Sequence, residues 1–535
     1  MTTADGPGSA APVPAPATVL LCSDIVGPRP GEFSPELICA GLRRSTPEVR
    51  VFVVPDLCSR SSGLPAGMPA LGNGRVVVGC RRGRAKRPRI MGVLRAAGVH
   101  GALTQVVDLA PGEGARPHEV VEQSVAKLRA ALARVSCTDI SAPVAETAVP
   151  LGTARFSRRN LFSLGYLAGH PVAGWRGDHC GGRGASRPCV QACPYQALSL
   201  AGPRISVEGA SCTGCGACVA ACRSGAMSLD GTSMAELAAA AGTLVEDACR
   251  LGLGVAVVCS AAVTDVPLGG PWLALEVPSL EMVSTGWVLQ IVAAGARATA
   301  LGCGEKACTG RARELTRLAA AVVSQVAPGR RHLVVGPGDR SRAGLGGELG
   351  VDASPLGRPR SAVLLHEPEA TVQALSALTE QPGPWRLESP VAPLGEIVID
   401  GERCSACECC VTACPTGAIS ASDGPGRGTL VLEFEPSACP ACGACVSSCP
   451  EGAVSLRRAI GSSCLAAGRQ AVAEVARFDR CVSCGKPVGE GVVTRVVAAK
   501  LVASHPEIAG RLRGHDRCPG CLLTMPGRTG TSGIA

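Results

Sequence analysis

Aromatic residues, long apolar runs and export signals are all scarce in this sequence. Aromatic residues make up only 2% of the 535 residues, whereas hydrophobic residues make up 46%. Small residues such as alanine, glycine and valine must therefore fill much of any core. No run of about 18 apolar residues is present, so a membrane-spanning helix is not expected. The first residues lack a basic segment followed by an apolar one, so a secretory signal peptide is not expected either.

The motifs of nucleotide binding and nucleophilic catalysis are also missing. We find no P-loop, no G-x-G-x-x-G motif that opens a helix after a strand, and no Ser/His/Asp arrangement. The net charge of +9 is mostly due to arginine. Few aromatic residues stand between the arginines, so nucleic-acid binding is not expected. The densest basic run, residues 81–89, fits a solvated loop or a docking patch for an acidic partner.

Cysteine, in contrast, is abundant, with 30 residues. Many of them stand at metal-ligand spacings in a long chain, unlike the cysteines of small disulfide-rich secreted domains. We therefore expect a reducing compartment, the cytoplasm. The pattern C-x2-C-x2-C-x3-C-P occurs twice between residues 404 and 450. Three thiolates at this spacing can hold one face of an iron–sulfur cube, while the fourth points toward a neighbouring cube.

This double motif, within residues 395–460, resembles bacterial-type dicluster ferredoxins. In that family the fourth cysteine of each motif ligates the other cluster. The resemblance implies two 4Fe–4S clusters, one held by Cys404, Cys407, Cys410 and Cys449 and one by Cys439, Cys442, Cys445 and Cys414. Cys409 is left over, and its side chain is expected to point away from the loop. The spacing disfavours the alternative, a zinc or disulfide framework.

Residues 156–230 are predicted to form a second dicluster module in which the first motif is altered. Its complete motif is followed by Arg223 in place of the usual proline. If the fourth cysteine of each motif again ligates the other cluster, as the resemblance implies, one full 4Fe–4S site results, made of Cys193, Cys212, Cys215 and Cys218. The other site would keep only Cys180, Cys189 and Cys222. Those ligands fit a 3Fe–4S cluster, or a 4Fe–4S cluster completed by Asp178, His179 or solvent, unless the site is lost and its cysteines only pack.

Residues 1–17 are rich in alanine and proline and are expected to be disordered. Strands at 18–22, 51–55 and 75–80, with helices between and after them, predict a small parallel α/β domain over residues 18–140. Residues 70–136 resemble the N-terminal region of the A-type subunit of heterodisulfide reductase, which implies docking to a larger redox complex. Four cysteines of this domain have no ligand spacing and are interpreted as small buried side chains: Cys22, Cys39, Cys58 and Cys80.

Residues 231–335 are predicted to form another α/β domain, with a strand at 254–259 that ends at Cys259 and a strand leading into Gly302-Cys303-x4-Cys308. This arrangement resembles the delta subunit of methyl-viologen-reducing hydrogenase, a family that carries a 2Fe–2S cluster. Ala262 and Ser279 stand where that family has further cysteines. At most Cys259, Cys303 and Cys308 remain as ligands, so a degenerate scaffold is favoured over a bound 2Fe–2S cluster.

Residues 336–394 are predicted to be a linker with a small α/β appendage, made of a strand at 361–366 and a helix at 369–378. The last candidate metal site lies in residues 475–525, where two C-x2-C pairs flank an insert that looks helical over 492–512: Cys481, Cys484, Cys518 and Cys521. Paired knuckles of this kind fit a structural zinc ribbon. They also resemble the iron-binding knuckles of rubredoxin, but the insert lacks the aromatic residues of that family, so zinc is favoured.

Taken together, these features predict a multidomain α/β plus α+β protein of the polyferredoxin kind. Its expected role is to pass electrons one at a time through three or four clusters. By resemblance, its partners would be a hydrogenase, a formate dehydrogenase or a complex similar to heterodisulfide reductase. Two alternatives remain. The chain could be catalytic and bind substrate at an open iron of the Cys180 site, or it could be redox-silent, with clusters that only stabilise an assembly.

Overall fold

The structure is a computed structural model that falls into two compact units, which are described separately. The first unit comprises residues 1–181, 188–366 and 373–381, and the second comprises residues 182–187, 367–372 and 382–535. The described residues are 17–23, 34–60, 64–65, 68, 71, 74–111, 116–138, 172–177, 180, 187–229, 232–259, 271–303, 306–328, 333–335, 366–379, 383–424, 429–466, 468–476, 479–481, 483–484, 486–488, 501–506 and 521.

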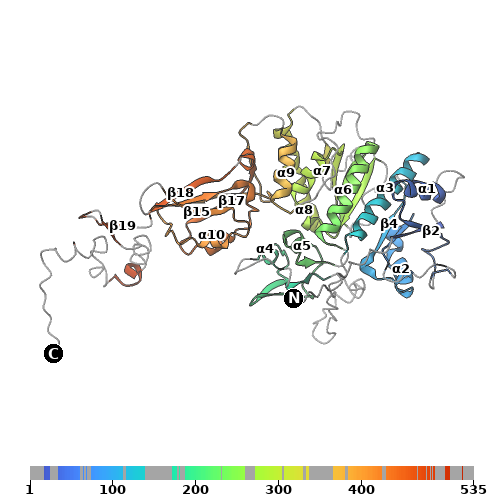
Figure 1. Ribbon diagram of the computed structural model, residues 1–535, viewed down its shortest axis with the longest axis horizontal. Coiled ribbons are helices and arrows are strands. Elements are labelled where there is room, and N and C mark those ends of the chain that lie inside the picture. The colour runs from blue at the N-terminus through green and yellow to red at the C-terminus, as the bar shows by residue number, and fades with distance from the viewer. Residues whose placement is uncertain are drawn as a thin grey trace, which may run out of the picture. The chain divides into compact units, whose positions relative to one another are not determined.

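The first unit begins with a parallel four-stranded sheet in the order β2-β1-β3-β4. Its strands are β1 (Thr18–Cys22), β2 (Arg50–Val54), β3 (Val76–Cys80) and β4 (Thr104–Asp108). The helices are α1 (Pro35–Ser45), α2 (Gly83–Ala96) and α3 (Pro117–Ser136), with a 3-10 turn, η2 (Gly101–Leu103), before β4. Strands β1 and β3 are buried along their whole length, as expected for near-continuous apolar runs in a parallel sheet. The α/β arrangement expected here is therefore present (Figure 1).

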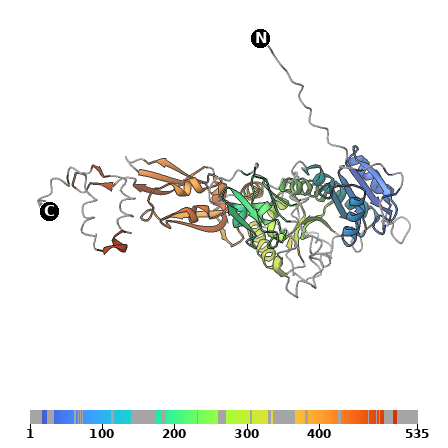
Figure 2. The ribbon, with the colours of Figure 1, turned by 90° about the horizontal axis from the view of Figure 1, so that it is seen from below.

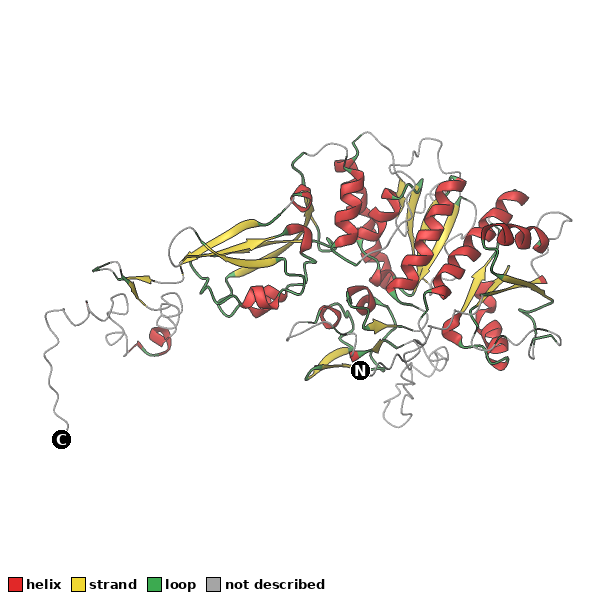
Figure 3. Cartoon of the chain, viewed as in Figure 1, coloured by secondary structure: helices red, strands yellow, loops and turns green. Residues whose placement is uncertain are grey.

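A second parallel sheet of the same unit has the equivalent order, β10-β9-β11-β12. Its strands are β9 (Gly254–Cys259), β10 (Trp272–Val277), β11 (Ala298–Gly302) and β12 (Leu333–Val335). The accompanying helices are α6 (Met234–Leu251), η6 (Leu280–Met282), α7 (Thr285–Ala293) and α8 (Lys306–Val326). Helix α6 starts where the sequence provides a capping box, because Ser233 and Glu236 each accept a hydrogen bond from the other's backbone amide. Figure 3 shows helices beside the strands of both sheets.

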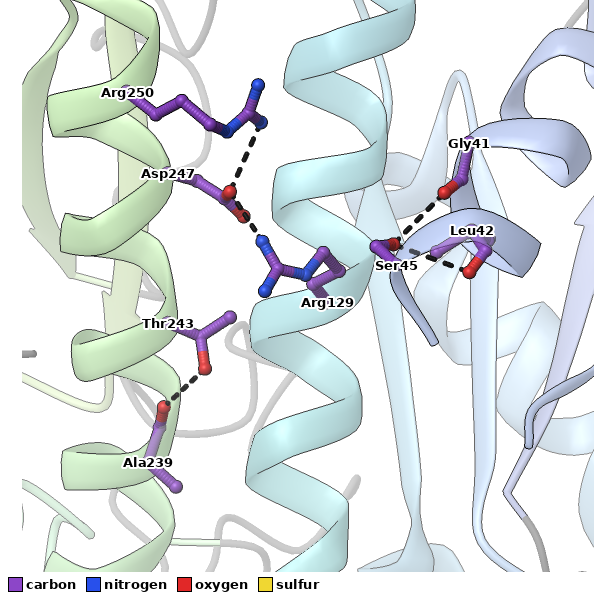
Figure 4. A network of polar contacts seen from close by, with 8 residues as sticks. All are labelled: Gly41, Leu42, Ser45, Arg129, Ala239, Thr243, Asp247 and Arg250. Atoms are coloured by element: carbon purple, nitrogen blue, oxygen red, sulfur yellow. Dashed lines mark hydrogen bonds and ion pairs between the residues drawn. The ribbon is translucent and has the colours of Figure 1, made fainter. Parts of the chain in front are cut away.

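Helices α3 and α6 pack against each other and join the two parallel sheets. Asp247, which is 1% exposed, accepts hydrogen bonds from Arg129 at 2.5 Å and from Arg250 at 3.2 Å. Figure 4 shows Arg129 reaching from α3 to Asp247 on α6. Arg134 of α3 donates to Thr232 Oγ1 at 2.9 Å. The two α/β domains are thus held together by polar contacts as well as by helix packing.

The basic run at residues 81–89 is not the solvated loop that was one of its two interpretations. Most of it lies in helix α2. Arg87 forms an ion pair with Glu276 at 2.7 Å and also donates to Val106 O at 3.1 Å. These contacts are possible because the long arginine stem lies along the fold while its guanidinium reaches acceptors on β4 and β10. At least this arginine therefore connects the two α/β domains.

The altered module also belongs to the first unit and is built from short elements. These are β5 (Gly174–Trp175), α4 (Pro188–Gln191), β6 (Leu198–Ala201), β7 (Arg204–Val207), α5 (Ala217–Ala221) and β8 (Met227–Ser228). Strands β5 and β8 pair over two residues each, and β6 pairs with β7 as an antiparallel hairpin. Helix α5 packs against η6 of the second α/β domain.

The second unit contains two three-stranded antiparallel sheets, β13-β17-β14 and β15-β16-β18, seen from two sides in Figures 1 and 2. Its strands are β13 (Arg386–Glu388), β14 (Gly395–Ile399), β15 (Ile419–Asp423), β16 (Thr429–Phe434), β17 (Val454–Gly461) and β18 (Gln470–Ala476). Short helices join them: α10 (Cys409–Ala413), η7 (Pro436–Ala438), α11 (Ala444–Ser448) and η8 (Ser462–Leu465). Helix α9 (Glu369–Leu378) precedes these strands in the sequence, and only its first residues, 369–372, are counted in the second unit. A small hairpin of β19 (Asp479–Arg480) and β20 (Pro487–Val488) follows the strands.

Strands β13 and β18 extend this module on both sides of the predicted range 395–460, so we call residues 386–476 the C-terminal ferredoxin module. Three expected features lie mostly or wholly outside the described residues: the disorder of residues 1–17, the strand at 361–366 and the helix at 492–512. Among the helices that are described, none is both long and apolar enough to cross a membrane.

Candidate iron–sulfur sites

Each three-cysteine loop of the C-terminal ferredoxin module has left-handed residues on both sides of its middle cysteine. Around Cys407 these are Ala406 (φ 55°) and Glu408 (φ 57°). In the second loop they are Ala441 (φ 52°) and Gly443 (φ 74°). Alternation of right- and left-handed residues turns successive amide groups toward one side, which makes a concave site for an anion. Three of these four residues are not glycine, so the loops adopt this shape against a local conformational cost.

The amide groups of these loops donate to the cysteine sulfurs. Cys404 and Cys439 each accept a hydrogen bond from the amide of the left-handed residue two positions later, Ala406 and Ala441 respectively. The fourth cysteine of each motif accepts a hydrogen bond from an amide in the turn that follows it. Cys414 accepts from Ala418 N at 3.2 Å, and Cys449 accepts from Ala453 N at 3.2 Å. Such hydrogen bonds favour negative charge on sulfur, the form in which cysteine ligates iron.

One group of thiols lines a cavity in this module. Cys414 lies beside Cys439, Cys442 and Cys445, although it comes from the other motif. All of them line the cavity, together with Ile397, Ile419, Phe434 and Leu456. Burial raises the pKa of Cys439 to about 12 and that of Cys445 to about 11. Such thiols stay protonated at neutral pH unless a metal ion takes the place of the proton.

The other group brings Cys449 to the loop of the first motif. Cys404 lies near Cys407 and Cys449, and Cys410 lies near Cys404 and Cys407. Burial raises the pKa of Cys410 to about 11. Cys409 is exposed, whereas Cys410 beside it is buried. These cysteines are neighbours, as they must be if the fourth cysteine of each motif ligates the other cluster. The assignment of each cysteine to a cluster stays a prediction.

The altered module repeats the thiol-lined cavity. Cys193, Cys212, Cys215 and Cys218 line it, the four cysteines that the resemblance assigns to one full site, and their role as ligands stays a prediction. Its volume, open solvent included, is about 320 Å³, close to the value of about 300 Å³ in the C-terminal ferredoxin module, so the two cavities are alike in size as well as in their cysteines. The left-handed positions around the middle cysteine are here Gly214 (φ 68°) and Gly216 (φ 81°). Ala197 N donates to Cys193 at 3.3 Å.

The second predicted site of the altered module is partly described. Cys189 lies near Cys222 and Cys180, so three thiols gather there. Burial raises the pKa of Cys189 to about 11. Cys222 accepts from Met227 N at 3.4 Å, one residue later than in the other motifs. Asp178 and His179 lie outside the described residues.

These observations fit an iron–sulfur cofactor. Sulfur is the donor atom throughout, the amides point at sulfur, and the two cavities have matching sizes and matching cysteines. An iron–sulfur cube bound by four thiolates is anionic, which the oriented amides favour.

In the second α/β domain, Cys259 and Cys303 lie at the ends of β9 and β11 and are buried. Cys259 Sγ donates to Pro278 O at 3.2 Å. The side chain of Cys308, in α8, lies outside the described residues. Within the described side chains, no set of three possible metal ligands includes Cys259 or Cys303. The 2Fe–2S site therefore stays a prediction.

Two groups of cysteines converge more tightly than those of the ferredoxin cavities. Cys481, Cys484 and Cys521 place their ligand atoms within 4.8 Å of one another, as the C-x2-C spacing predicted, while Cys518 lies outside the described residues. Cys22, Cys58 and Cys80 do the same, although their spacing along the chain is not that of metal ligands. The only signal in the sequence was that Cys22 and Cys80 end strands and Cys58 follows one.

Comparison with known protein families supports part of this interpretation. The family model described as a 4Fe-4S dicluster domain matches residues 403–454. No curated protein matches the chain significantly. The family match and the cysteine-rich sites together indicate an iron–sulfur protein with a ferredoxin-type domain.

Proposed function

We propose that this chain is an electron-transfer protein that carries electrons one at a time between redox partners through two dicluster modules. The observation that carries the proposal is the repetition of one thiol-lined cavity, with the same four cysteine positions and nearly equal volume, in both modules. The ferredoxin-type match over residues 403–454 supports the same conclusion for the C-terminal ferredoxin module.

The protein's own residues would hold, insulate and tune the clusters. When bound, a 4Fe–4S cluster supplies reversible exchange of one electron. Ile397, Phe434 and Leu456 exclude water from one cavity, and Ala418 N and Ala441 N donate to its sulfurs. Exclusion of water and hydrogen bonds to sulfur shift the reduction potential of a cluster in opposite directions, and their balance sets its value.

Cys407 is the exposed ligand of its group, whereas Cys404 and Cys410 are buried. Electron transfer between proteins requires a cluster near the surface, so the Cys407 side is the proposed point of exchange with a partner. By resemblance, that partner is a hydrogenase, a formate dehydrogenase or a complex similar to heterodisulfide reductase. Zinc at the Cys481 knuckles is proposed as a structural site of the same chain.

The decisive experiment is anaerobic analysis of iron, sulfide and zinc, combined with EPR spectra of the oxidised and dithionite-reduced protein. Two dicluster modules predict about 15 or 16 irons per chain and clusters that reduce reversibly. A chain with iron near zero and several zinc ions would overturn the proposal. A chain with about eight irons would restrict it to the C-terminal ferredoxin module.

A catalytic role at the Cys180 site is the second candidate, because three thiols gather there in the described residues, fewer than a four-iron cube uses. An artificial electron donor with the purified chain tests it. Turnover of a small oxidant that disappears in Cys189→Ala, while Cys442→Ala retains it, would favour catalysis at this site. Equal rates in both variants would exclude it.

A further inference from the structure

Cys22, Cys58 and Cys80 come together at the carboxyl end of the first parallel sheet. Cys22 ends the central strand β1 and Cys80 ends its neighbour β3. Cys58 follows β2 in a turn in which the amides of Ser59 and Arg60 both donate to Asp56 O. All three cysteines are 0% exposed, and their sulfurs lie within 4.8 Å of one another.

The location is one where parallel sheets bind ligands. The strand order is β2-β1-β3-β4, so the chain passes from β1 to β2 on one side of it and then crosses to β3 and β4 on the other side. The topological switch point of the sheet therefore lies between β1 and β3. Ligands of open α/β sheets bind outside the carboxyl ends of the strands at such a point. Cys22 and Cys80 are the residues that end those two strands.

The second α/β domain provides an internal comparison. In the first sheet Leu21 pairs with Gly79, which sets Cys22 beside Cys80. In the second sheet Val258 pairs with Gly302, which sets Cys259 beside Cys303 in the same register. The edge strands then continue as Val54-Pro-Asp-Leu-Cys58 and Val277-Pro-Ser-Leu-Glu281. Glu281 instead faces Arg311, with 3.7 Å between their charged atoms. The two domains thus share two thiols, and only the first domain has the third.

The spacing of the three sulfurs decides what they can hold. A metal ion with bonds of about 2.3 Å to sulfur places its thiolates about 3.8 Å apart. Sulfurs already within 4.8 Å of one another need to move little to reach that geometry. Among the described residues, the cysteines that line the ferredoxin cavities do not converge within this distance, as expected for ligands spread around a larger cube.

Part of the surroundings suits the negative charge of such a site, although the hydrogen bond with Cys22 and burial raise the pKa of the Cys80 thiol when no metal is bound. The amide of Arg82 donates to Cys80 Sγ, immediately before α2. Helix α2 has 14 residues, and the positive end of its dipole faces the same edge of the sheet. Arg81 and Arg82 add positive charge next to Cys80 in the sequence.

We propose that Cys22, Cys58 and Cys80 bind a single thiophilic d10 metal ion, Zn²⁺ or Cu⁺, as a mononuclear three-thiolate site separate from the iron–sulfur clusters. Soft thiolate ligands select these ions. Cu⁺ is satisfied by three thiolates, whereas Zn²⁺ requires a fourth ligand in addition.

The test uses the full chain purified without oxygen, in a Cys481→Ala/Cys484→Ala background that removes the other compact thiol site. After exposure to Zn²⁺ alone or Cu⁺ alone and gel filtration, the background chain should retain about one ion of the preferred metal. Cys22→Ser and Cys80→Ser should each lose it, with iron content unchanged. Co²⁺ should give a thiolate charge-transfer band that the same variants lack.

Cys39→Ser is the matched control, since Cys39 is a buried cysteine of the same domain outside the group. It should keep both the ion and the cobalt band. Unchanged binding in Cys22→Ser would overturn the proposal. Loss of iron instead of zinc or copper would show a cluster, and a Cys22–Cys80 disulfide, seen by mass in the metal-treated chain, would show a redox pair; either result would also overturn it.

Discussion

The C-terminal ferredoxin module and the altered module place their cysteines in the same turns but are stabilised by different surroundings. The former has a core of its own, in which Ile419, Leu432 and Phe434 pack with Cys404 and Cys439. The latter has short strands, and its helix α5 packs against η6 of the neighbouring α/β domain. Ala220 of α5 also accepts a hydrogen bond from His366, at 3.0 Å.

This difference suggests that the cavity and its support are separable. The cavity is specified locally, by cysteine spacing and left-handed residues, and it recurs with nearly the same volume. Support is supplied by long antiparallel pairings in one module and by an adjoining domain in the other. A module with an external support can therefore lose part of one motif, as at Cys180, without losing the complete site.

Removal of one ligand from each cavity tests the comparison most strongly. Cys442→Ala and Cys215→Ala change equivalent positions, and each should lower the iron content by about four per chain, because a cube cannot be held without that ligand. Iron and sulfide analysis measures the loss. Cys409→Ala, at an exposed cysteine in the same module, should keep full iron. Loss of iron in Cys442→Ala alone would show that the altered module binds no cluster at its complete site.

The support of each module can be weakened separately through one arginine. Arg134 donates to Thr232 Oγ1 at 2.9 Å and to Glu276 O at 3.3 Å, next to the bridge between Leu229 and Thr232 that ends the altered module. Arg134→Met should destabilise the first unit by about 2–3 kcal/mol, because charged hydrogen bonds are lost at partly buried carbonyl and hydroxyl groups. Hydrogen exchange followed by mass spectrometry locates the effect, which should spare residues 386–476.

Arg458 is the matched arginine of the C-terminal ferredoxin module, where it donates to Ala392 O at 3.1 Å and Ala441 O at 2.9 Å. Arg458→Met should raise exchange around the Ala441 loop and leave the first unit unchanged. If both variants loosened both modules equally, the two supports would not be independent.

Two equivalent glycines probe the contact between the altered module and its neighbour. Gly216 and Gly443 both have positive φ, 81° and 74°. An added Cβ would lie 3.0 Å from Met282 Sδ at Gly216, but its nearest neighbour at Gly443 would be Leu456 at 4.0 Å. Gly443→Ala should cost about 1 kcal/mol, from backbone conformation alone. Gly216→Ala should cost about 2 kcal/mol, since Met282 must also move. Denaturant unfolding measures the free energy of unfolding of both variants. Equal losses would show that Met282 can move away from the added Cβ without cost.

Local patterns predicted much of the structure. The strand at 254–259 and the helix at 369–378 have the predicted bounds, and the four turns after Cys193, Cys222, Cys414 and Cys449 are alike. Hydrophobic periodicity and cysteine spacing carry this information within a few residues of sequence. The assignment of the fourth cysteine of each motif to the other cluster came from the family resemblance together with the spacing, which turns that cysteine away from the first three.

Features that depend on distant segments were not predictable. The Cys22, Cys58 and Cys80 group forms only because a parallel sheet aligns three strand ends separated by many residues. Strands β13 and β18 were missed because their weakly apolar sequences become strands only by pairing with β17 and β16. A helix was expected over residues 91–97, but its first part, residues 83–90, was missed because the arginines there hid the helical pattern that buried residues such as Ile90 reveal.

The smallest predicted effect concerns the turn after the fourth cysteine of each motif. In all four turns the amide of the third following residue donates to the cysteine carbonyl, and that residue has positive φ. It is glycine in three of the turns, Gly225, Gly417 and Gly452, but Gln196 (φ 52°) in the turn after Cys193. Gln196→Gly should therefore stabilise the first unit by about 0.5–1 kcal/mol, because glycine adopts this conformation without steric cost.

The reciprocal variant belongs to the other module. Gly417→Ala, where an added Cβ would meet nothing within 4 Å, should destabilise the second unit by about 1 kcal/mol. Gln196→Ala is the control for the loss of the glutamine side chain, and it should give no gain, since the Cβ that causes the strain remains. A stabilisation of Gln196→Ala equal to that of Gln196→Gly would mean that the side chain, rather than the left-handed backbone, distinguishes the turn after Cys193 from the other three.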